Sequence, residues 1–384
     1  MNVQNFSFPT PILFGAGAIS QLPQRLTRLG ITRPLVVTDA GLAGTPTFTR
    51  LQQILSSEMQ NKHWFLFTDV HPNPIEQDVK GAAIAFRENG CNGVIAFGGG
   101  SPLDAGKAAR LLVKRPDMRL ADFDFNDDWS GLAPLVCIPT TAGTGSEVGR
   151  SSVITPAGSD RKKVIFHPEL LAKQVILDAE LTRDLPPKLT AATGADALTH
   201  CIESFTCPVF HPMCDGIALE GIHIIIQALP RAYNNGADME ARGSMLIAAS
   251  MGAVSFQKDL GAVHALAHPL SSVCGLHHGL ANALCLTAVM RFNSERKLGL
   301  YRRIGIACGI DLASASDKEA DLRTIEFIDQ FLKRLSLSGR LSEYGVKESH
   351  IEILTTQAVA DPCLPTNAVP VNESEIKNLY KNLI

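Results

Sequence analysis

Two kinds of periodicity divide this 384-residue chain, and they limit its fold more than any other feature. Runs rich in β-branched and aromatic residues alternate with helix-like patterns as far as Leu185-Pro186-Pro187. Such alternation is typical of a parallel sheet, because each parallel strand needs a crossover that is usually a helix. Beyond that point only the three- and four-residue spacing of amphipathic helices recurs. We therefore expect an α/β domain at 1–185 and an all-α domain at 186–384, with a cleft between them.

Individual elements follow from the same patterns. The expected strands are 34–38, 63–67, 93–97, 134–138 and 174–177, and the helices between them are 21–29, 47–59, 75–88 and 103–112. The expected C-terminal helices are 189–205, 212–229, 238–256, 281–292, 316–335 and 348–359.

Composition and charge argue against several classes of protein. A formal net charge of -3 gives no basic surface for nucleic acid. The N-terminus lacks the pattern of a signal peptide, and the most apolar stretch, 246–256, is shorter than the about 18 residues of a membrane span. The nine cysteines form no Cys-x-x-Cys pair, so neither a disulfide framework nor a zinc ribbon is indicated. We expect a soluble, cytoplasmic protein with no nucleic-acid or membrane partner.

A glycine-rich loop, Gly98-Gly99-Gly100-Ser101-Pro102, follows an expected strand and opens an expected helix. Its glycines let backbone N–H groups approach an anion at the positive end of that helix, which suits a pyrophosphate. Ser101 is the expected N-cap, with Asp104 completing a capping box. A tight turn without a ligand is the alternative. The earlier Gly15-Ala16-Gly17 lacks the third glycine of a dinucleotide fingerprint, and we interpret it as a turn.

Two further strand ends carry groups that suit a dinucleotide. Asp39 follows the first expected strand, and its carboxylate can accept both ribose hydroxyls of NAD while repelling the extra phosphate of NADP. An equally good interpretation is a cap of the loop before Gly41. The segment Thr140-Thr141-Ala142-Gly143-Thr144 offers hydroxyls for phosphate or carboxamide, or else forms a simple turn. Three such loops together indicate a dinucleotide site better than any one alone.

Histidines give the sharpest signal. Four of the 11 histidines lie close together in the sequence: His264, His268, His277 and His278. The pairs Asp196–His200 and His264–His268 are each spaced to share one face of a helix. An aspartate on an apolar face is costly to bury without a partner, and a cation supplies one. One carboxylate with several imidazoles suits Fe(II), Zn, Mn or Co. The spacing predicts a metal site but leaves the choice among the four later histidines open.

These motifs resemble those of the iron-containing alcohol dehydrogenases, essentially from end to end of the chain. The resemblance is carried by Gly98–Pro102, Pro139–Glu147, Ala192–His200 and Gly261–Asn282. It implies an N-terminal, Rossmann-like dinucleotide-binding domain, a C-terminal helical metal-binding domain and a homodimer. It also implies NAD rather than NADP, and one divalent metal ion, iron(II) ahead of zinc.

The resemblance also implies roles for single residues. It implies that the metal ligands are Asp196, His200, His264 and His278. His268 then matches a catalytic non-ligand that assists proton transfer, and His277 stands where many relatives carry proline. The implied cofactor-binding residues are Asp39, Asn73, Gly98, Gly99, Gly100, Ser101, Thr140, Thr141, Thr144, Lys163 and Leu181.

The activity implied is interconversion of a small alcohol and its aldehyde or ketone, by hydride transfer to or from NAD(H), with the metal polarising the substrate oxygen. Phe256 and Cys274 are pocket candidates that favour an uncharged, modest-sized alcohol, although the segment 269–276 departs from the commoner family pattern. A lyase resembling dehydroquinate synthases, with NAD as an internal catalyst, is the nearest alternative. A metal-dependent phosphoester hydrolase is another, but its two-metal sites usually need more carboxylates than Asp196 supplies. A non-enzymatic binding module is the third.

Overall fold

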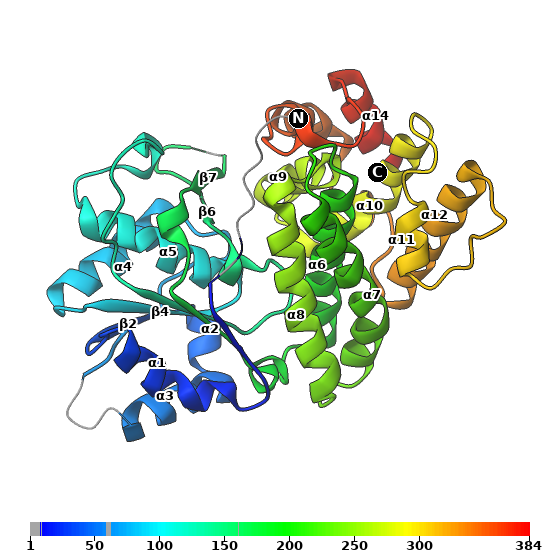
Figure 1. Ribbon diagram of the computed structural model, residues 1–384. Helices are drawn as coiled ribbons and strands as arrows, with labels where there is room; N and C mark the ends of the chain where they lie inside the picture. The colour runs from blue at the N-terminus through cyan, green and yellow to red at the C-terminus, as the bar shows by residue number, and fades with distance from the viewer. Residues whose placement is uncertain (1–7, 9, 59–62, 160) are drawn as a thin grey trace. The chain divides into compact units, whose positions relative to one another are not determined.

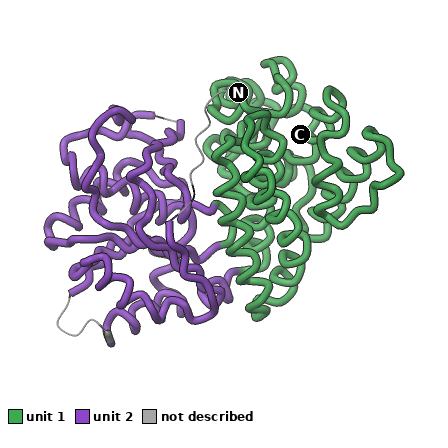
Figure 2. Tube along the Cα trace, viewed as in Figure 1, with its two compact units in different colours: residues 1–7, 142–144, 186–384 green, residues 8–141, 145–185 purple. Residues whose placement is uncertain are grey.

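The chain forms two compact units. The computed structural model describes residues 8, 10–58, 63–159 and 161–384 (Figure 1). Phe8–Thr141 and Gly145–Leu185 form one unit, which we term the sheet unit; Ala142–Thr144 and Pro186–Ile384 form the other, the helical unit (Figure 2). The short piece 142–144 groups with the helices because Gly143 lies against Thr193, where an added Cβ would come within 2.8 Å of the Thr193 Cβ.

A six-stranded parallel sheet forms the centre of the sheet unit, in the order β1-β8-β5-β4-β2-β3. The strands are β1 Ile12–Phe14, β2 Pro34–Val37, β3 Phe65–Phe67, β4 Gly93–Gly98, β5 Leu135–Pro139 and β8 Gln174–Leu177. Strands β2, β4, β5 and β8 are buried along their whole length, because helices lie on both faces of the sheet. This arrangement confirms the predicted parallel α/β fold.

The helices of the sheet unit are α1 Leu22–Arg28, α2 Ala40–Ala43, α3 Pro46–Glu58, α4 Glu76–Glu88 and α5 Gly100–Lys114. Helices α1 and α3 lie on one face of the sheet, and α4 and α5 on the other (Figure 1). The sequence predicted these four close to their observed bounds; Met59, the expected end of α3, lies outside the described residues. It did not predict α2 or the antiparallel hairpin of β6 Ser151–Ile154 and β7 Lys163–Phe166, all of which are too short for periodicity to stand out.

Strand order brings the predicted ligand loops together. Strand β2 has β3 on one side and β4 on the other, so the chain reverses direction across the sheet at this point. In parallel sheets such a switch point opens a crevice at the carboxyl ends of the strands. Because β5, β4 and β2 are neighbours, Thr140 and Asp39 follow strands that end at this edge, and Gly98 is the last residue of a third.

The described part of the helical unit contains no strand. Its helices are α6 Pro187–Thr206, α7 Pro212–Asn234, α8 Met239–Ser255, α9 Ala262–Cys274, α10 His278–Ser294, α11 Arg302–Ala307, α12 Asp317–Arg334, α13 Ile351–Val359 and α14 Glu373–Leu383. The six helices expected here are present. Helix α9 was indicated only by its paired histidines, since Pro269 interrupts its pattern. The short α11 and the terminal α14 were not expected.

Helix α7 is the one described helix that is long and apolar enough, by length and composition alone, to cross a membrane. The segment that the sequence indicated as the most apolar stretch of the chain, 246–256, is a different and shorter one. One face of α7, which includes Ile222, Ile225 and Leu229, is buried, and the helix packs against α6 and α8. Such packing is typical of a core helix in a helical bundle.

Candidate metal centre and dinucleotide-binding edge

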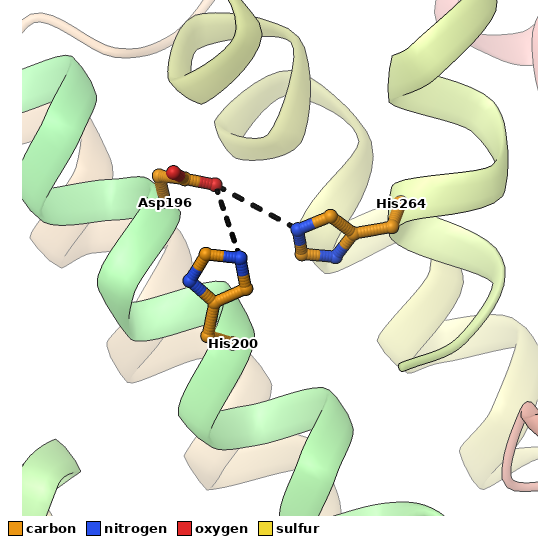
Figure 3. Close-up of side chains that lie close together, drawn as sticks. All are labelled: Asp196, His200 and His264. Atoms are coloured by element: carbon orange, nitrogen blue, oxygen red, sulfur yellow. Dashed lines mark ion pairs between the residues drawn. The ribbon is translucent and has the colours of Figure 1, made fainter. Parts of the chain in front are cut away.

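Asp196, His200, His264 and His278 converge inside the helical unit. Helix α6 carries Asp196 and His200 on one face, and α9 presents His264 to the same carboxylate (Figure 3). His278 opens helix α10. Gly279 allows this close approach, because a Cβ there would lie 2.0 Å from the carbonyl oxygen of Ala192. Three helices therefore supply the cluster, as the i,i+4 spacing and the family resemblance together led us to expect.

Asp196, His200 and His264 offer ligand atoms that all lie within 4.8 Å of one another, as one metal ion requires, and His278 approaches the same carboxylate oxygen. Asp196 Oδ1 lies 3.7 Å from Nε2 of His200, 3.7 Å from Nε2 of His264 and 3.4 Å from Nε2 of His278. Ligand atoms about 2.1 Å from a tetrahedral metal are about 3.4 Å from one another. Asp196, His200 and His264 are buried, whereas the His278 side chain is 25% exposed and gives the cluster an open side.

Burial and neighbouring charges shift the pKa values of Asp196, His200 and His264 in different directions. Burial opposes the ionisation of Asp196, but the neighbouring His200 and His278 and a hydrogen bond with His264 hold its pKa well below the usual value. Burial lowers the pKa of His200 to about 4. Burial also acts to lower the pKa of His264, but hydrogen bonds with Asp196 and Glu203 raise it to about 9. A cation that binds here therefore meets an ionised carboxylate and a neutral His200, and displaces a proton from His264.

Two polar residues that the sequence did not single out contact the candidate ligands. Asn282, buried on α10, donates its Nδ2 hydrogen to Asp196 Oδ1 over 2.7 Å. Glu203, buried on α6, accepts from Nδ1 of His264 over 2.6 Å. Glu203 lies one helical turn beyond His200, on the face that Asp196 and His200 share. This helical spacing is the sequence signal that could have identified it.

His268 stands beside the cluster in a different environment. Its ring stacks on His278 with centroids 5.3 Å apart, and its Nδ1 lies 2.7 Å from Asp361 Oδ2. Cys363 is also near, and its backbone N–H donates to Asp361. Two ligands of one metal ion are normally about 3 Å apart or more, so 2.7 Å marks a hydrogen bond rather than a second metal site. Asp361 is far from His268 in sequence, and no local pattern pointed to it.

The adjacent residues His277 and His278 lie in different surroundings. His278 faces Asp196, whereas His277 is exposed and forms the N-terminal boundary of α10. Of the pocket candidates, the Phe256 ring lies 5.1 Å from the His200 ring. Cys274 instead contacts His350, with its Sγ 3.5 Å from Nδ1. Phe256 is therefore the candidate that borders the metal cluster.

In the sheet unit, the glycine-rich loop ends β4 and begins α5. Gly98 has φ +146, and a Cβ there would lie 2.7 Å from Pro102 Cγ. The N-cap is Gly99 and no side chain caps the helix, so the expected Ser101 cap and capping box are wrong. Asp104 is instead held by Ser146 Oγ at 2.5 Å and the Val153 N–H at 2.9 Å. The first-turn N–H groups of α5 therefore have no side-chain partner within the helix and can serve an anion.

The neighbouring loops reach the same edge. Thr140 donates its N–H to the Gly98 carbonyl over 2.9 Å, and an added Cβ on Gly99 would lie 3.5 Å from Thr141 Oγ1. Thr144 belongs to the helical unit, whereas Thr140 and Thr141 belong to the sheet unit. Asp39 caps α2 through Oδ1, which accepts from the Leu42 N–H at 2.8 Å. Both interpretations of Asp39 are compatible with this geometry, because Oδ2 has no hydrogen-bond donor among the described residues.

The Gly15–Gly17 loop already holds an anion of the chain itself. The Asp178 carboxylate accepts from the N–H of Gly17 and of Ile19, each at 3.0 Å. These two N–H groups are therefore already paired with a side chain of the same unit, in agreement with the interpretation of this loop as a turn.

Three of the expected cofactor contacts are less favourably placed. Asn73 accepts from Lys162 Nζ over 2.8 Å, so Lys162 rather than Lys163 faces it. The Lys163 ammonium donates to the carbonyls of Ala121, at 2.7 Å, and Leu120, at 3.3 Å. The Leu181 side chain is buried in the core of the sheet unit, leaving only its backbone for a ligand. Roles for these three in cofactor binding stay predictions.

Comparison with known proteins places this geometry in a family. The chain matches the description "Iron-containing alcohol dehydrogenase" over residues 9–179 and "Fe-containing alcohol dehydrogenase family, C-terminal" over 190–384. A 4-hydroxybutyrate dehydrogenase of Cupriavidus necator is 36% identical, with 97% of each chain covered.

Solved structures that resemble this chain support the same family. A 1,3-propanediol oxidoreductase is 30% identical, with a TM-score of 0.95 over 99% of this chain and 100% of the other. A sulfoacetaldehyde reductase of Bifidobacterium kashiwanohense, in complex with NAD+, is 28% identical, with a TM-score of 0.88 over 100% and 99%. Two family matches that together span almost the whole chain, supported by these relatives, establish its kinship: the protein belongs to the iron-containing alcohol dehydrogenases.

Proposed function

We propose that this protein oxidises a small alcohol, or reduces the corresponding aldehyde or ketone, with NAD(H) and one divalent metal ion. The observation that carries the proposal is one buried carboxylate with three imidazoles around it, whose Nε2 atoms lie 3.7, 3.7 and 3.4 Å from Asp196 Oδ1. Iron(II) is the ion we favour because of the family, and zinc suits the same nitrogen and oxygen donors. Asp196, His200, His264 and His278 would hold it.

Bound there, the metal supplies a Lewis acid that favours the ionised form of an alcohol, and NAD supplies the hydride acceptor. The chain provides the surroundings. Phe256 packs its ring against His200 and keeps water from that side of the cluster. The partly exposed His278 marks the side from which a substrate oxygen would approach.

His268 is the group we assign to proton transfer. Asp361 engages its Nδ1, so Nε2 is the nitrogen left to exchange a proton with the substrate hydroxyl. The His268 side chain is 21% exposed, and a proton taken up there can pass to solvent.

The edge of the sheet unit suits NAD. The uncapped start of α5 at Gly98–Ser101 fits the pyrophosphate, and the Thr140 and Thr141 loop lies beside it. The Asp39 carboxylate at the end of β2 favours NAD over NADP, because a 2′-phosphate there would meet a like charge. Both oxidoreductase relatives and the NAD+ complex of a structural neighbour support this assignment over the lyase and the hydrolase.

Net change of absorbance at 340 nm tests the activity. We expect NADH to accumulate when the iron(II)-loaded protein receives NAD+ and members of a panel of primary alcohols, diols and hydroxy acids, including 1,3-propanediol and 4-hydroxybutyrate. His200→Ala should abolish turnover, whereas Gly216→Ala, at an open helical position, should not. A lyase that recycles its NAD internally would give no net change with any alcohol or aldehyde, and that result would remove the proposal. The homodimer implied by the resemblance is tested by light scattering on the same sample.

A further inference from the structure

Glu203 is a buried carboxylate that touches a candidate metal ligand without being one. It lies on α6, one turn past His200, and it contacts the start of α9. We propose that Glu203 is a positioning residue that orients His264 for metal binding. This inference rests on the proposed metal site and adds a residue to it.

The Glu203 carboxylate makes three contacts with α9. Oε1 accepts from the Val263 N–H over 2.7 Å, and Oε2 accepts from the His264 N–H over 3.3 Å. Oε2 also accepts from His264 Nδ1 over 2.6 Å. The N-cap of α9, Gly261, has no side chain to offer, and an added Cβ there would lie 2.8 Å from Glu203 Oε1. The Glu203 carboxylate therefore takes the place of a side-chain N-cap for α9, and it also hydrogen-bonds the imidazole of His264 on that helix.

The contact with Nδ1 determines which nitrogen of His264 can bind a cation. An ionised carboxylate only accepts hydrogen bonds, so the hydrogen of the neutral ring must be on Nδ1. Nε2 then keeps its lone pair, and it is Nε2 that faces Asp196 at 3.7 Å. The ring is further confined by stacking on His200, with centroids 4.7 Å apart and planes 15° from parallel.

A carboxylate that fixes the tautomer and angle of a ligating histidine usually raises metal affinity, and its loss costs about 10–100-fold. Glutamine at 203 keeps the size of the side chain, but its NH2 group would face a backbone N–H of α9. Glu203→Gln therefore removes the acceptor-only character on which the tautomer depends. We expect the affinity of the protein for Zn(II), measured by competition with a chromophoric chelator, to fall about 10–100-fold in Glu203→Gln.

Asp321 provides a matched control in the same unit. Its buried carboxylate accepts from the N–H of Gly299 and of Tyr301, each at 2.8 Å, and it touches no histidine among the described residues. Asp321→Asn removes a comparable backbone-bound carboxylate, so it should lower the unfolding temperature and leave Zn(II) affinity unchanged. The comparison separates orientation of His264 from general loss of stability.

Nitrogen-15 NMR of selectively labelled histidine gives a readout that does not depend on a variant. In the Zn(II)-loaded wild-type protein we expect His264 to carry its hydrogen on Nδ1 and to coordinate through Nε2. The reverse pattern would overturn the proposal even if Glu203→Gln failed to fold, and so would Glu203→Gln with wild-type Zn(II) affinity. Retention of Zn(II) by His200→Ala would instead remove the underlying metal site, so the two failures are distinguishable.

Discussion

The histidines around Asp196 differ in what surrounds them, and their surroundings decide their chemistry. His200 and His264 are both buried, yet the pKa of His200 falls to about 4 because burial disfavours its charge, while hydrogen bonds with two carboxylates raise that of His264 to about 9. His268 lies at the margin of the cluster against Asp361. One residue type thus supplies candidate metal ligands and a candidate proton carrier.

The sequence alone predicted only some of the residues in the candidate metal site. The i,i+4 spacing identified Asp196 with His200 and His264 with His268, because a helix aligns such pairs. It could not choose His278 over His277, since that choice depends on where α10 begins, and the family resemblance was needed. Asp361 comes from a distant segment, and its contact with His268 is made by the tertiary fold.

The Asp361–His268 contact leads to a prediction about turnover. Burial opposes ionisation of Asp361, but the neighbouring His268 and its hydrogen bond lower the pKa of that carboxyl below its usual value. Asp361→Asn removes the anion that holds the imidazole, and we expect kcat to fall about 10- to 100-fold, within the about 10²–10⁴-fold that acid–base groups contribute. Metal content and the KM for NAD should not change.

A double-mutant cycle and a pH series check this interpretation. In a His268→Ala background, Asp361→Asn should have little further effect on kcat; an additive loss would show that Asp361 acts independently. Because the folded-state pKa of Asp361 is lowered, its contribution to stability is present above the ordinary value of 3.8 and is lost as pH falls through the folded pKa. The stability difference between wild type and Asp361→Asn should therefore shrink only in that acidic range.

Among the secondary-structure elements, the ends of neighbouring strands determine where the candidate cofactor-binding residues lie. The sequence predicted β2, β4 and β5 well, because each is a continuous buried run. Their order in the sheet is what brings Asp39, Gly98 and Thr140 to one edge, and that order comes from topology rather than from any local pattern. The incorrect N-cap of α5 has a similar cause: Asp104 is engaged by Ser146 and Val153, which only the folded sheet unit brings near.

Gly98 gives an element-scale prediction. Alanine at this position must accept φ +146 and a Cβ 2.7 Å from Pro102 Cγ, so the β4–α5 turn has to shift. We expect Gly98→Ala to raise the KM for NAD at least about tenfold and to cost about 1–3 kcal/mol of stability. Gly44→Ala is the control, because an added Cβ there meets no atom within 4 Å and the residue ends α2 in the same unit.

Fluorescence titration with NADH and chemical denaturation measure the two effects separately. Weakened NADH binding in Gly98→Ala, beside unchanged binding in Gly44→Ala, supports the pyrophosphate role of the loop. Equal NADH affinity in both variants would show that the cofactor binds elsewhere. Metal affinity should be the same in both, since the candidate ligands lie in the helical unit.

At the scale of the whole molecule, the two units carry separate halves of the proposed chemistry. The sheet unit holds the loops suited to a dinucleotide, and the helical unit holds the candidate metal ligands. Membership of the iron-containing alcohol dehydrogenases joins these halves into one enzyme. Periodicity predicted the α/β-then-helical architecture, because residue spacing differs between strand and helix, whereas the substrate depends on pocket side chains whose identity no spacing encodes.

We propose that this chain is an NAD-linked alcohol dehydrogenase that depends on one metal ion, held by Asp196, His200, His264 and His278. The most direct measurement is an anaerobic titration of metal-free protein with iron(II), in which bound metal and the rate of NADH formation are followed in the same samples. We predict that activity rises in proportion to occupancy, reaches its limit at one ion per chain, and is absent from Asp196→Ala at matched iron(II). Full turnover in the metal-free protein, or in Asp196→Ala, would show that the reaction needs no metal ion at Asp196.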